Sequence, residues 1–282
     1  MIFEKARAKI NLTLDVLHKR SDGYHEVEMV MQTVDFCDYI SLQSSATGKV
    51  SVHSNALYIP NDERNLAFRA AQVLRTQLGV RDGVVIDIDK RIPVAAGLAG
   101  GSADAAAVLR GLNQLWNLQL SREELCTIGA EVGSDVPFCV VGGTAVVRGR
   151  GEYVESLAAH PSFWVVLAKP PLAVSTAEIY AALDMTRIHT HPHAESMVQA
   201  LTQGDLRAVA KAAGNVLEEV TISQYPEIDK LKDQIERLGA RVALMSGSGP
   251  TVFALFEREQ RARRVFNTLR RTLKEVYLCQ TC

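Results

Sequence analysis

The sequence predicts an α+β protein built from two domains. The chain has 282 residues, which is long for one domain and comfortable for two. Strand-like and helix-like runs follow one another along its whole length. A polar stretch from Gly149 to Pro161 separates an earlier series of such runs from a later one. We therefore expect the first domain at residues 1–155 and the second at residues 156–282.

The composition argues against several classes of partner. Apolar residues make up 47% of the chain, charged residues 22%, and the net charge is −1. Proteins that bind nucleic acids usually carry more basic than acidic residues, and this chain does not. Apolar runs such as 163–168 are far too short to cross a bilayer, and charged residues near the N-terminus argue against a signal peptide. We expect a cytoplasmic protein that binds a small molecule, with no nucleic-acid or membrane partner, as a monomer or weak homodimer.

Neither the cysteines nor the histidines indicate a metal centre. The five cysteines are odd in number and scattered, which is typical of reduced thiols. His189, His191 and His193 alternate in a polar stretch with no acidic or cysteine ligand nearby in the sequence, so solvated loop residues are the better interpretation. We assign no residue to a metal site.

The first strand is expected over residues 2–19. Apolar and polar side chains alternate over nine positions in its middle. Lys9, Asn11, Thr13 and Asp15 therefore share the face opposite the apolar one. This polar face is either solvated or part of a substrate cleft.

A turn and a helix are predicted next. Asp-Gly in the turn 21–25 supplies the positive φ that tight turns use, and an extended run follows. On the pattern alone, Tyr24 and His25 are ordinary hairpin residues. Asn65 is expected to cap a helix that ends near Gly79.

The chain is organised around a glycine loop between a strand over 84–89 and a helix. Glycines let a backbone approach a ligand closely, and a helix N-terminus adds unpaired N–H donors and about half a positive charge. These features favour phosphate binding. The alternative is an ordinary tight turn with Ser102 as the helix N-cap. The loop comprises Pro93, Val94, Ala95, Ala96, Gly97, Leu98, Ala99, Gly100, Gly101, Ser102 and Ala103.

This loop differs from the two common nucleotide-binding motifs. The pattern G-x-x-x-x-G-K-[ST] requires a lysine where Gly101 stands. The dinucleotide pattern G-x-G-x-x-G is also absent. A phosphate loop without a lysine must take its positive charge from elsewhere in the chain.

Asp135 is the candidate carboxylate. It follows a helix that begins at Ser121 with a capping-box pattern and ends near Gly133. It precedes Pro137 and an expected strand over 140–147. A carboxylate between these elements is either a capping group or a catalytic one, and the pattern favours neither.

The second domain continues the alternation. A strand over 163–169 leads into helices, one of them expected over 227–238. The strands 242–245 and 252–256 flank a glycine turn, and a basic amphipathic helix over 259–274 precedes a last strand.

Three segments, in this order, resemble the GHMP kinase superfamily, named for galactokinase, homoserine kinase, mevalonate kinase and phosphomevalonate kinase. They are the strand with Lys9, the loop 93–103, and the turn Ser-Gly-Ser-Gly-Pro-Thr at 246–251. The loop matches P-x-x-x-G-L-[GA]-[GS]-[GS]-S-[AS], with alanine at 95, 96 and 99 where many members carry glycine. The resemblance implies a first domain like ribosomal protein S5 domain 2 and a ferredoxin-like α/β second domain.

Further segments narrow the resemblance within the superfamily. Ala-Lys-Ile-Asn-Leu-Thr-Leu at 8–14, Asp-Gly-Tyr-His at 22–25 and Ser-Asp-Val-Pro-Phe at 134–138 are similar to the 4-diphosphocytidyl-2-C-methyl-D-erythritol kinase family. This family transfers the γ-phosphoryl group of ATP to the 2-hydroxyl of that cytidyl compound in non-mevalonate isoprenoid synthesis. The resemblance covers the chain nearly end to end.

The resemblance also implies roles for single residues. Loop 93–103 would hold the ATP phosphates, and Mg²⁺ would come with ATP. Asp135 would accept the hydroxyl proton and Lys9 would stabilise the charge on that oxygen. The substrate contacts would be Asn11, Tyr24, His25, Thr176 and Tyr180, with the cytosine between the two tyrosine rings and His25 at its edge.

Two alternatives remain at this point. Another GHMP kinase, of homoserine or mevalonate type, accounts for the loop and the fold but leaves Gly23-Tyr24-His25 unexplained. A catalytically inactive nucleotide sensor with this fold is the other, and the presence of both Lys9 and Asp135 argues against it.

Overall fold

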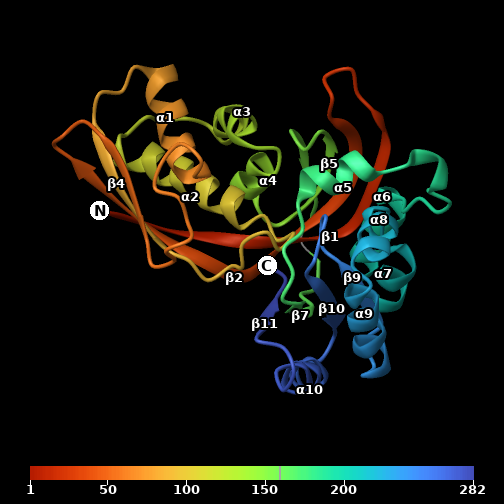
Figure 1. Ribbon diagram of the computed structural model, residues 1–282. Coiled ribbons are helices and arrows are strands. Elements are labelled where there is room, and N and C mark those ends of the chain that lie inside the picture. The colour runs from red at the N-terminus through yellow and green to blue at the C-terminus, as the bar shows by residue number, and fades with distance from the viewer. Residues whose placement is uncertain (159) are drawn as a thin grey trace.

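The computed structural model describes residues 1–158 and 160–282 and contains two β-sheets with helices packed against them (Figure 1). This arrangement confirms the α+β prediction. Ala159, which falls in the expected boundary stretch, lies outside the described residues. The strands of the larger sheet run in the order β3-β4-β2-β1-β8, with β5 paired to β2 and β6 to β5. Its strands are β1 Ile2–Lys19, β2 His25–Ser45, β3 Val50–Ser54, β4 Gly83–Asp89, β5 Thr144–Gly149, β6 Tyr153–Ser156 and β8 Gly214–Asn215.

Four helices pack with this sheet, and Figure 1 shows them on the side of the long β1–β2 pair that faces away from the second sheet. Alanines at 103, 106 and 107 lie on one side of α2 and Ala105 on another, and all four are buried, so small side chains let this helix pack closely against its neighbours. The helices are α1 Leu66–Leu78, α2 Gly100–Leu115, α3 Arg122–Val132 and α4 Val136–Val141.

The smaller sheet has the strand order β11-β7-β10-β9, and all its pairs are antiparallel. Its strands are β7 Trp164–Lys169, β9 Val242–Met245, β10 Val252–Phe256 and β11 Glu275–Gln280. The helical elements of this half are α5 Thr176–Ala182, the 3₁₀ turn Met185–Arg187, α6 Ala194–Gln203, α7 Leu206–Ala212, α8 Leu217–Gln224, α9 Glu227–Arg237 and α10 Glu259–Leu269.

The strand β1 is the element that both halves share. It pairs with β2 along its length and, at Thr13 and Leu14, with the short β8 of the later half. Every residue from Ala8 to Val16 is buried, so this stretch is covered on both faces. The register with β2 shifts on either side of Lys9 and Asn11, as β-bulges do where a strand re-aims side chains beside a functional site.

Several sequence expectations need correction. The polar face of β1 is not solvated, because its four polar side chains are among the buried residues. The strand expected over 140–147 is divided: a short helix, α4, ends at Val141, and β5 begins only at Thr144 after two glycines with positive φ. The helix expected over 259–274 ends at Leu269, before a turn that leads into β11.

Ser102 does not cap the helix that follows the glycine loop. The helix α2 begins at Gly100, and its N-cap is Ala99 in the left-handed region, with no side-chain capping bond. Ser102 lies within the first turn instead. By contrast, the Asn65 cap of α1 with its Gly79 C-cap, and the Ser121–Glu124 capping box of α3, are confirmed.

Candidate active site

A cavity of about 810 Å³ joins the two halves of the molecule. Residues of β1, the 23–25 turn, the glycine loop, the segment before α4, α5 and the 247–248 turn all contribute to its wall. Every residue that the sequence nominated lines this cavity except Ala103, whose side chain is buried in the α2 interface. The size suits a drug-sized or nucleotide-sized ligand.

Lys9 and Asp135 meet in this wall. Lys9 Nζ donates a hydrogen bond to Asn11 Oδ1 (2.7 Å) and lies 3.5 Å from Asp135 Oδ2. The lysine side chain is 5% exposed and the aspartate side chain 29% exposed, so the carboxylate is the member of the pair that reaches the open cavity. Asp135 is the N-cap residue of α4, with Pro137 at its start, yet its side chain makes no capping bond. Its carboxylate is therefore not a capping group, which was one of the two possibilities that the sequence pattern left open.

Asn11 fixes the lysine from the side. Its Oδ1 accepts from Lys9, and its Nδ2 donates to the sulfur of Met29 at 3.3 Å. The Lys9 amide also donates to Leu98 O (3.2 Å), which ties this part of β1 to the glycine loop. A methyl group at Gly247 would lie 3.4 Å from Lys9 Nζ, so the later half of the chain closes the other side. The ammonium group is therefore enclosed by Asn11, Asp135 and the backbone at Gly247.

The glycine loop is held in a tight, partly left-handed conformation. Ala95, Gly97 and Ala99 have φ values of 50°, 73° and 54°. An alanine can adopt this left-handed conformation, at a cost in free energy. At Gly97 a Cβ would in addition clash with Ser246 O, at a distance of 2.0 Å. Ser246 Oγ donates to Gly97 O at 2.9 Å. The turn 246–251 thus clamps the loop from the second half of the molecule.

The loop presents the start of α2 to the cavity. Gly100, Gly101 and Ser102 form the first turn of this 16-residue helix, and no side chain caps it. Its free N–H groups and the positive end of the helix dipole make an anion site without a lysine.

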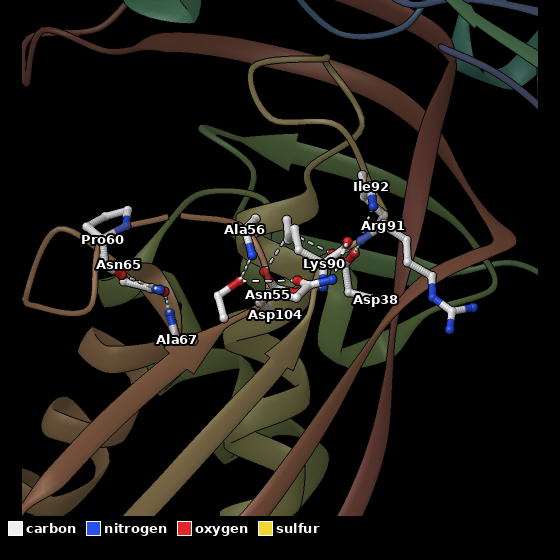
Figure 2. A network of polar contacts seen from close by, with 11 residues as sticks. Asp38, Asn55, Ala56, Pro60, Asn65, Ala67, Lys90, Arg91, Ile92 and Asp104 are labelled. Carbon is white, nitrogen blue, oxygen red and sulfur yellow. Dashed lines mark hydrogen bonds and ion pairs between the residues drawn. The ribbon is translucent and has the colours of Figure 1, made fainter. Parts of the chain in front are cut away.

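Beneath the loop lies a buried ion cluster that the sequence analysis missed. Lys90 Nζ donates to Asp38 Oδ2 and Asp104 Oδ2, both at 2.6 Å, and all three side chains are at most 5% exposed (Figure 2). Asp38 also accepts from the amides of Arg91 and Ile92, just before the loop. Asp104 comes just after it, so the cluster ties the two ends of the loop together.

The two carboxylates of the cluster are not equivalent. Asp38 is satisfied by the lysine and two backbone N–H groups, while Asp104 Oδ1 is buried with no hydrogen-bond partner among the described residues. Burial, reinforced by the nearby Asp38 carboxylate, raises the pKa of Asp104 to about 8. Burial alone would lower the pKa of Lys90, but Asp104 and Asp38 together raise it by more, so the net effect is a raised pKa. The sequence signal for this cluster was weak, because its three members are far apart in the chain and lie on different elements.

A second feature beyond the sequence analysis is the wall next to α1. Asn65 caps α1 through Oδ1 and donates from Nδ2 to Pro60 O at 2.9 Å (Figure 2). Ile59, Pro60 and Leu66 line the cavity beside it, and so does Arg64, which forms an ion pair with Asp62 (2.7 Å). An Asn-cap signal was visible in the sequence, but nothing there indicated that the residues around the cap face the same cavity as the glycine loop.

The aromatic residues lie at the end of the cavity near the 23–25 turn. The rings of His25 and Tyr180 are 5.3 Å apart between centroids and inclined at 37°. Burial and the charge of Lys19 lower the pKa of His25, which favours the neutral form of its imidazole. Burial, and then the Asp135 charge, raise the pKa of the Tyr180 hydroxyl above its ordinary value. Tyr24 is about half exposed, and its ring faces the Arg150 guanidinium at 5.2 Å.

Thr176 joins this group from the later half. It begins α5, and its Oγ1 lies 2.8 Å from Ser248 Oγ, so the helix is tied to the turn that clamps the glycine loop. Among the described residues, no three His, Cys, Asp or Glu side chains are grouped as a metal ion would need. No helix in the described part of the chain is long and apolar enough to cross a membrane.

The fold and site define a class of protein: a small-molecule kinase of the GHMP type. The model of the GHMP kinase N-terminal domain matches residues 65–143, and that of the GHMP kinase C-terminal domain matches residues 197–275. The first match contains both the glycine loop and Asp135.

Individual relatives are more specific. A protein of Brevibacillus brevis named 4-diphosphocytidyl-2-C-methyl-D-erythritol kinase is 53% identical over 97% of this chain and 94% of its own length. A protein of the same name from Bacillus mycoides is 52% identical over the same shares. A crystal structure of 4-(cytidine 5'-diphospho)-2C-methyl-D-erythritol kinase superposes with a TM-score of 0.84, at 32% identity and 99% coverage of both chains. The chain therefore belongs to the 4-diphosphocytidyl-2-C-methyl-D-erythritol kinase family of GHMP kinases.

Proposed function

We propose that this protein transfers the γ-phosphoryl group of ATP to the 2-hydroxyl of 4-diphosphocytidyl-2-C-methyl-D-erythritol, a reaction of non-mevalonate isoprenoid synthesis. The observation that carries the proposal is the Lys9–Asp135 pair at 3.5 Å, in the same cavity as the glycine loop and the His25–Tyr180 pair. The names of the close relatives support the choice of acceptor.

The chemistry asks the protein mainly for positioning and charge compensation. The acceptor oxygen attacks the γ-phosphorus, the bond to the β–γ bridging oxygen breaks, and ADP leaves. In this proposal the hydroxyl proton passes to Asp135, the exposed member of the pair. Lys9, fixed by Asn11, stabilises the negative charge that develops on the attacking oxygen.

Phosphate binding is assigned to residues 93–103. The uncapped first turn of α2 offers N–H donors, and the clamp from Ser246 holds the loop in shape before ATP arrives. Because the Lys90 ammonium already donates hydrogen bonds to Asp38 and Asp104, the loop's own backbone rather than a lysine side chain meets the phosphates.

The residues present fit a magnesium ion that arrives with ATP. Mg²⁺ is usually held largely by substrate phosphates and waters, and the wall supplies the Ser102 hydroxyl as a further oxygen ligand. When bound, the ion would offset charge on the phosphate oxygens.

Substrate recognition is assigned to Tyr24, His25, Thr176 and Tyr180, with Asn11 as a further contact. The neutral His25 imidazole can both donate and accept a hydrogen bond, as the edge of a cytosine requires. Stacking on an aromatic side chain suits the base itself.

A kinase assay with radiolabelled ATP and Mg²⁺ tests this function. The purified protein receives 4-diphosphocytidyl-2-C-methyl-D-erythritol, homoserine, mevalonate or 2-C-methylerythritol 4-phosphate in parallel, and we expect label only in the cytidyl product. Comparable transfer to homoserine or mevalonate would establish the broader GHMP alternative. Binding of ATP without transfer to any acceptor would establish the nucleotide sensor.

A further inference from the structure

We propose that Arg150 is a specificity-determining residue that binds the diphosphate of a nucleotide-linked acceptor. The inference rests on the proposed function and deepens it. It starts from the position of Arg150, which lines the cavity directly after the end of β5 and was not among the sequence candidates.

Arg150 lies between the two ends of the acceptor site. On one side its guanidinium carbon is 5.2 Å from the centre of the Tyr24 ring. On the other side its neighbour Gly151 packs so closely on Ser134 that a Cβ there would be 2.6 Å from Ser134 O. Ser134 directly precedes Asp135. The chain at 150–151 therefore lies between the aromatic turn and the segment that carries Asp135.

The geometry of the substrate matches this span. Its base belongs at the aromatic end and its reactive hydroxyl at Asp135, so its diphosphate has to pass between them. A guanidinium with parallel N–H donors recognises phosphate oxygens in pairs, which a lysine does not.

Among the described residues, the guanidinium of Arg150 also has no carboxylate in an ion pair with it, so its charge is available to an anionic ligand. Five cationic side chains line the cavity, and three of them have carboxylate partners: Lys9 with Asp135, Arg64 with Asp62, and Lys90 with Asp38 and Asp104. Within the described residues, Arg150 and Lys19 have no ion-pair partner; the Arg150 side chain donates only to Ala130 O, at 3.3 Å.

Lys19 is the less suitable of the two. It ends β1, where it pairs with His25 of β2, and its charge acts on the His25 imidazole. Arg150 is fixed by three contacts: its amide donates to Glu152 Oε2 (2.6 Å), its Nη2 to Ala130 O, and its guanidinium faces Tyr24. A pre-organised cation loses less freedom when it binds an anion.

Calorimetry with cytidine, cytidine monophosphate and cytidine diphosphate tests the assignment, with the ATP site saturated by a non-hydrolysable ATP analogue. Wild-type protein should bind the diphosphate more tightly than cytidine. In Arg150→Gln the diphosphate should bind roughly ten- to a hundredfold more weakly, as expected for charge-assisted hydrogen bonds. The affinity of Arg150→Gln for cytidine should fall by no more than about threefold, which is the part that Tyr24 contributes through its contact with Arg150.

The controls separate the alternatives. Arg148→Gln, two residues earlier and paired with Glu28 and Glu155, should bind all three compounds as wild type does. Arg150→Lys should restore only part of the diphosphate preference. Equal losses for cytidine and its diphosphate in Arg150→Gln would reduce Arg150 to a support for Tyr24 and overturn the proposal, and so would loss of the preference in Lys19→Gln alone.

Kinase turnover distinguishes this inference from the proposed function. If the wild-type protein phosphorylates the cytidyl acceptor and Arg150→Gln keeps its KM, the function stands and the role of Arg150 is wrong. If wild type binds none of the cytidine compounds, the proposed acceptor itself is wrong.

Discussion

Lys9 Nζ lies 3.5 Å from Asp135 Oδ2, and the lysine is the buried member of the pair while the aspartate reaches the cavity. The two residues come from a long strand and from the start of a short helix, so the pair exists only in the folded chain. Asn11 Oδ1 accepts a hydrogen bond from the same ammonium, so two side chains hold Lys9 in place.

Asp135→Asn and Lys9→Ala should therefore abolish most of the turnover while ATP still binds. A positioned base contributes about 10²–10⁴-fold, and we expect losses in that range. Single-turnover transfer from radiolabelled ATP gives the rate, and calorimetry gives the ATP affinity. Lys5→Ala, an exposed lysine on the same strand, is the control and should behave as wild type. Wild-type turnover in Asp135→Asn would remove this carboxylate from the mechanism.

Gly97→Ala should weaken ATP binding and lower stability. The new Cβ would meet Ser246 O at 2.0 Å, so the clamp between the loop and the 246–251 turn must open. Gly79→Ala is a matched control, because Gly79 has a similar φ of 64° and open space around it. It should cost only about 1–2 kcal/mol of unfolding free energy and leave the KM for ATP unchanged. If both variants bind ATP equally well, the clamp does not shape the phosphate site.

The raised pKa of Asp104 predicts how the stability of the protein depends on pH. Its pKa is about 8 in the folded protein and 3.8 as an ordinary aspartate, so between these values the folded state holds a proton that the unfolded state has released. The contribution of Asp104 to the free energy of unfolding should therefore fall as pH rises from about 4 to about 8, by up to about 1.4 kcal/mol per pH unit. Urea unfolding at several pH values measures this slope.

The variant Asp104→Asn should remove that slope, because an amide does not titrate and still accepts from Lys90. Asp87→Asn, an exposed carboxylate on β4, is the control and should keep it. A slope that persists unchanged in Asp104→Asn would show that the carboxyl group is ionised throughout this range.

The sequence predicted local features best where local rules decide them. The Asn65 cap, the Ser121–Glu124 capping box and the strand–loop–helix junction around Gly97 all follow from neighbouring residues, and the structure has them. The alternative with Ser102 as N-cap would begin α2 three residues too late, because the left-handed Ala99 takes the N-cap position without a side-chain capping bond.

Features that depend on distant contacts were beyond prediction from the sequence. The polar face of β1 is buried by contacts from several distant elements, such as Asp135 at Lys9, Met29 at Asn11 and His191 at Asp15. Alternation alone does not distinguish such a covered polar face from a solvated one. The Lys90 cluster combines residues of β2, α2 and the segment after β4, and Arg150 reaches Tyr24 from the end of β5. Neither arrangement leaves a local signal.

The aromatic end of the cavity should decide which base the acceptor carries. Tyr180→Ala and Tyr24→Ala should raise the KM for the cytidyl substrate roughly tenfold and leave that for ATP nearly unchanged, since stacking on a base is worth about 1–3 kcal/mol. Leu183→Ala, at the C-cap residue of α5, is a control for general loosening of that helix and should raise neither KM as strongly.

His25, whose neutral imidazole is favoured by burial, should form hydrogen bonds with the polar edge of the base, where cytosine and uracil exchange donor for acceptor. An unpaired buried group costs about 1–3 kcal/mol, so kcat/KM should be about 5- to 150-fold higher for the cytidyl than for the uridyl substrate. His25→Ala should reduce this preference. The measurement is kcat/KM for both substrates in wild type and in His25→Ala, and equal values for the two bases in wild type would remove base recognition from this part of the cavity.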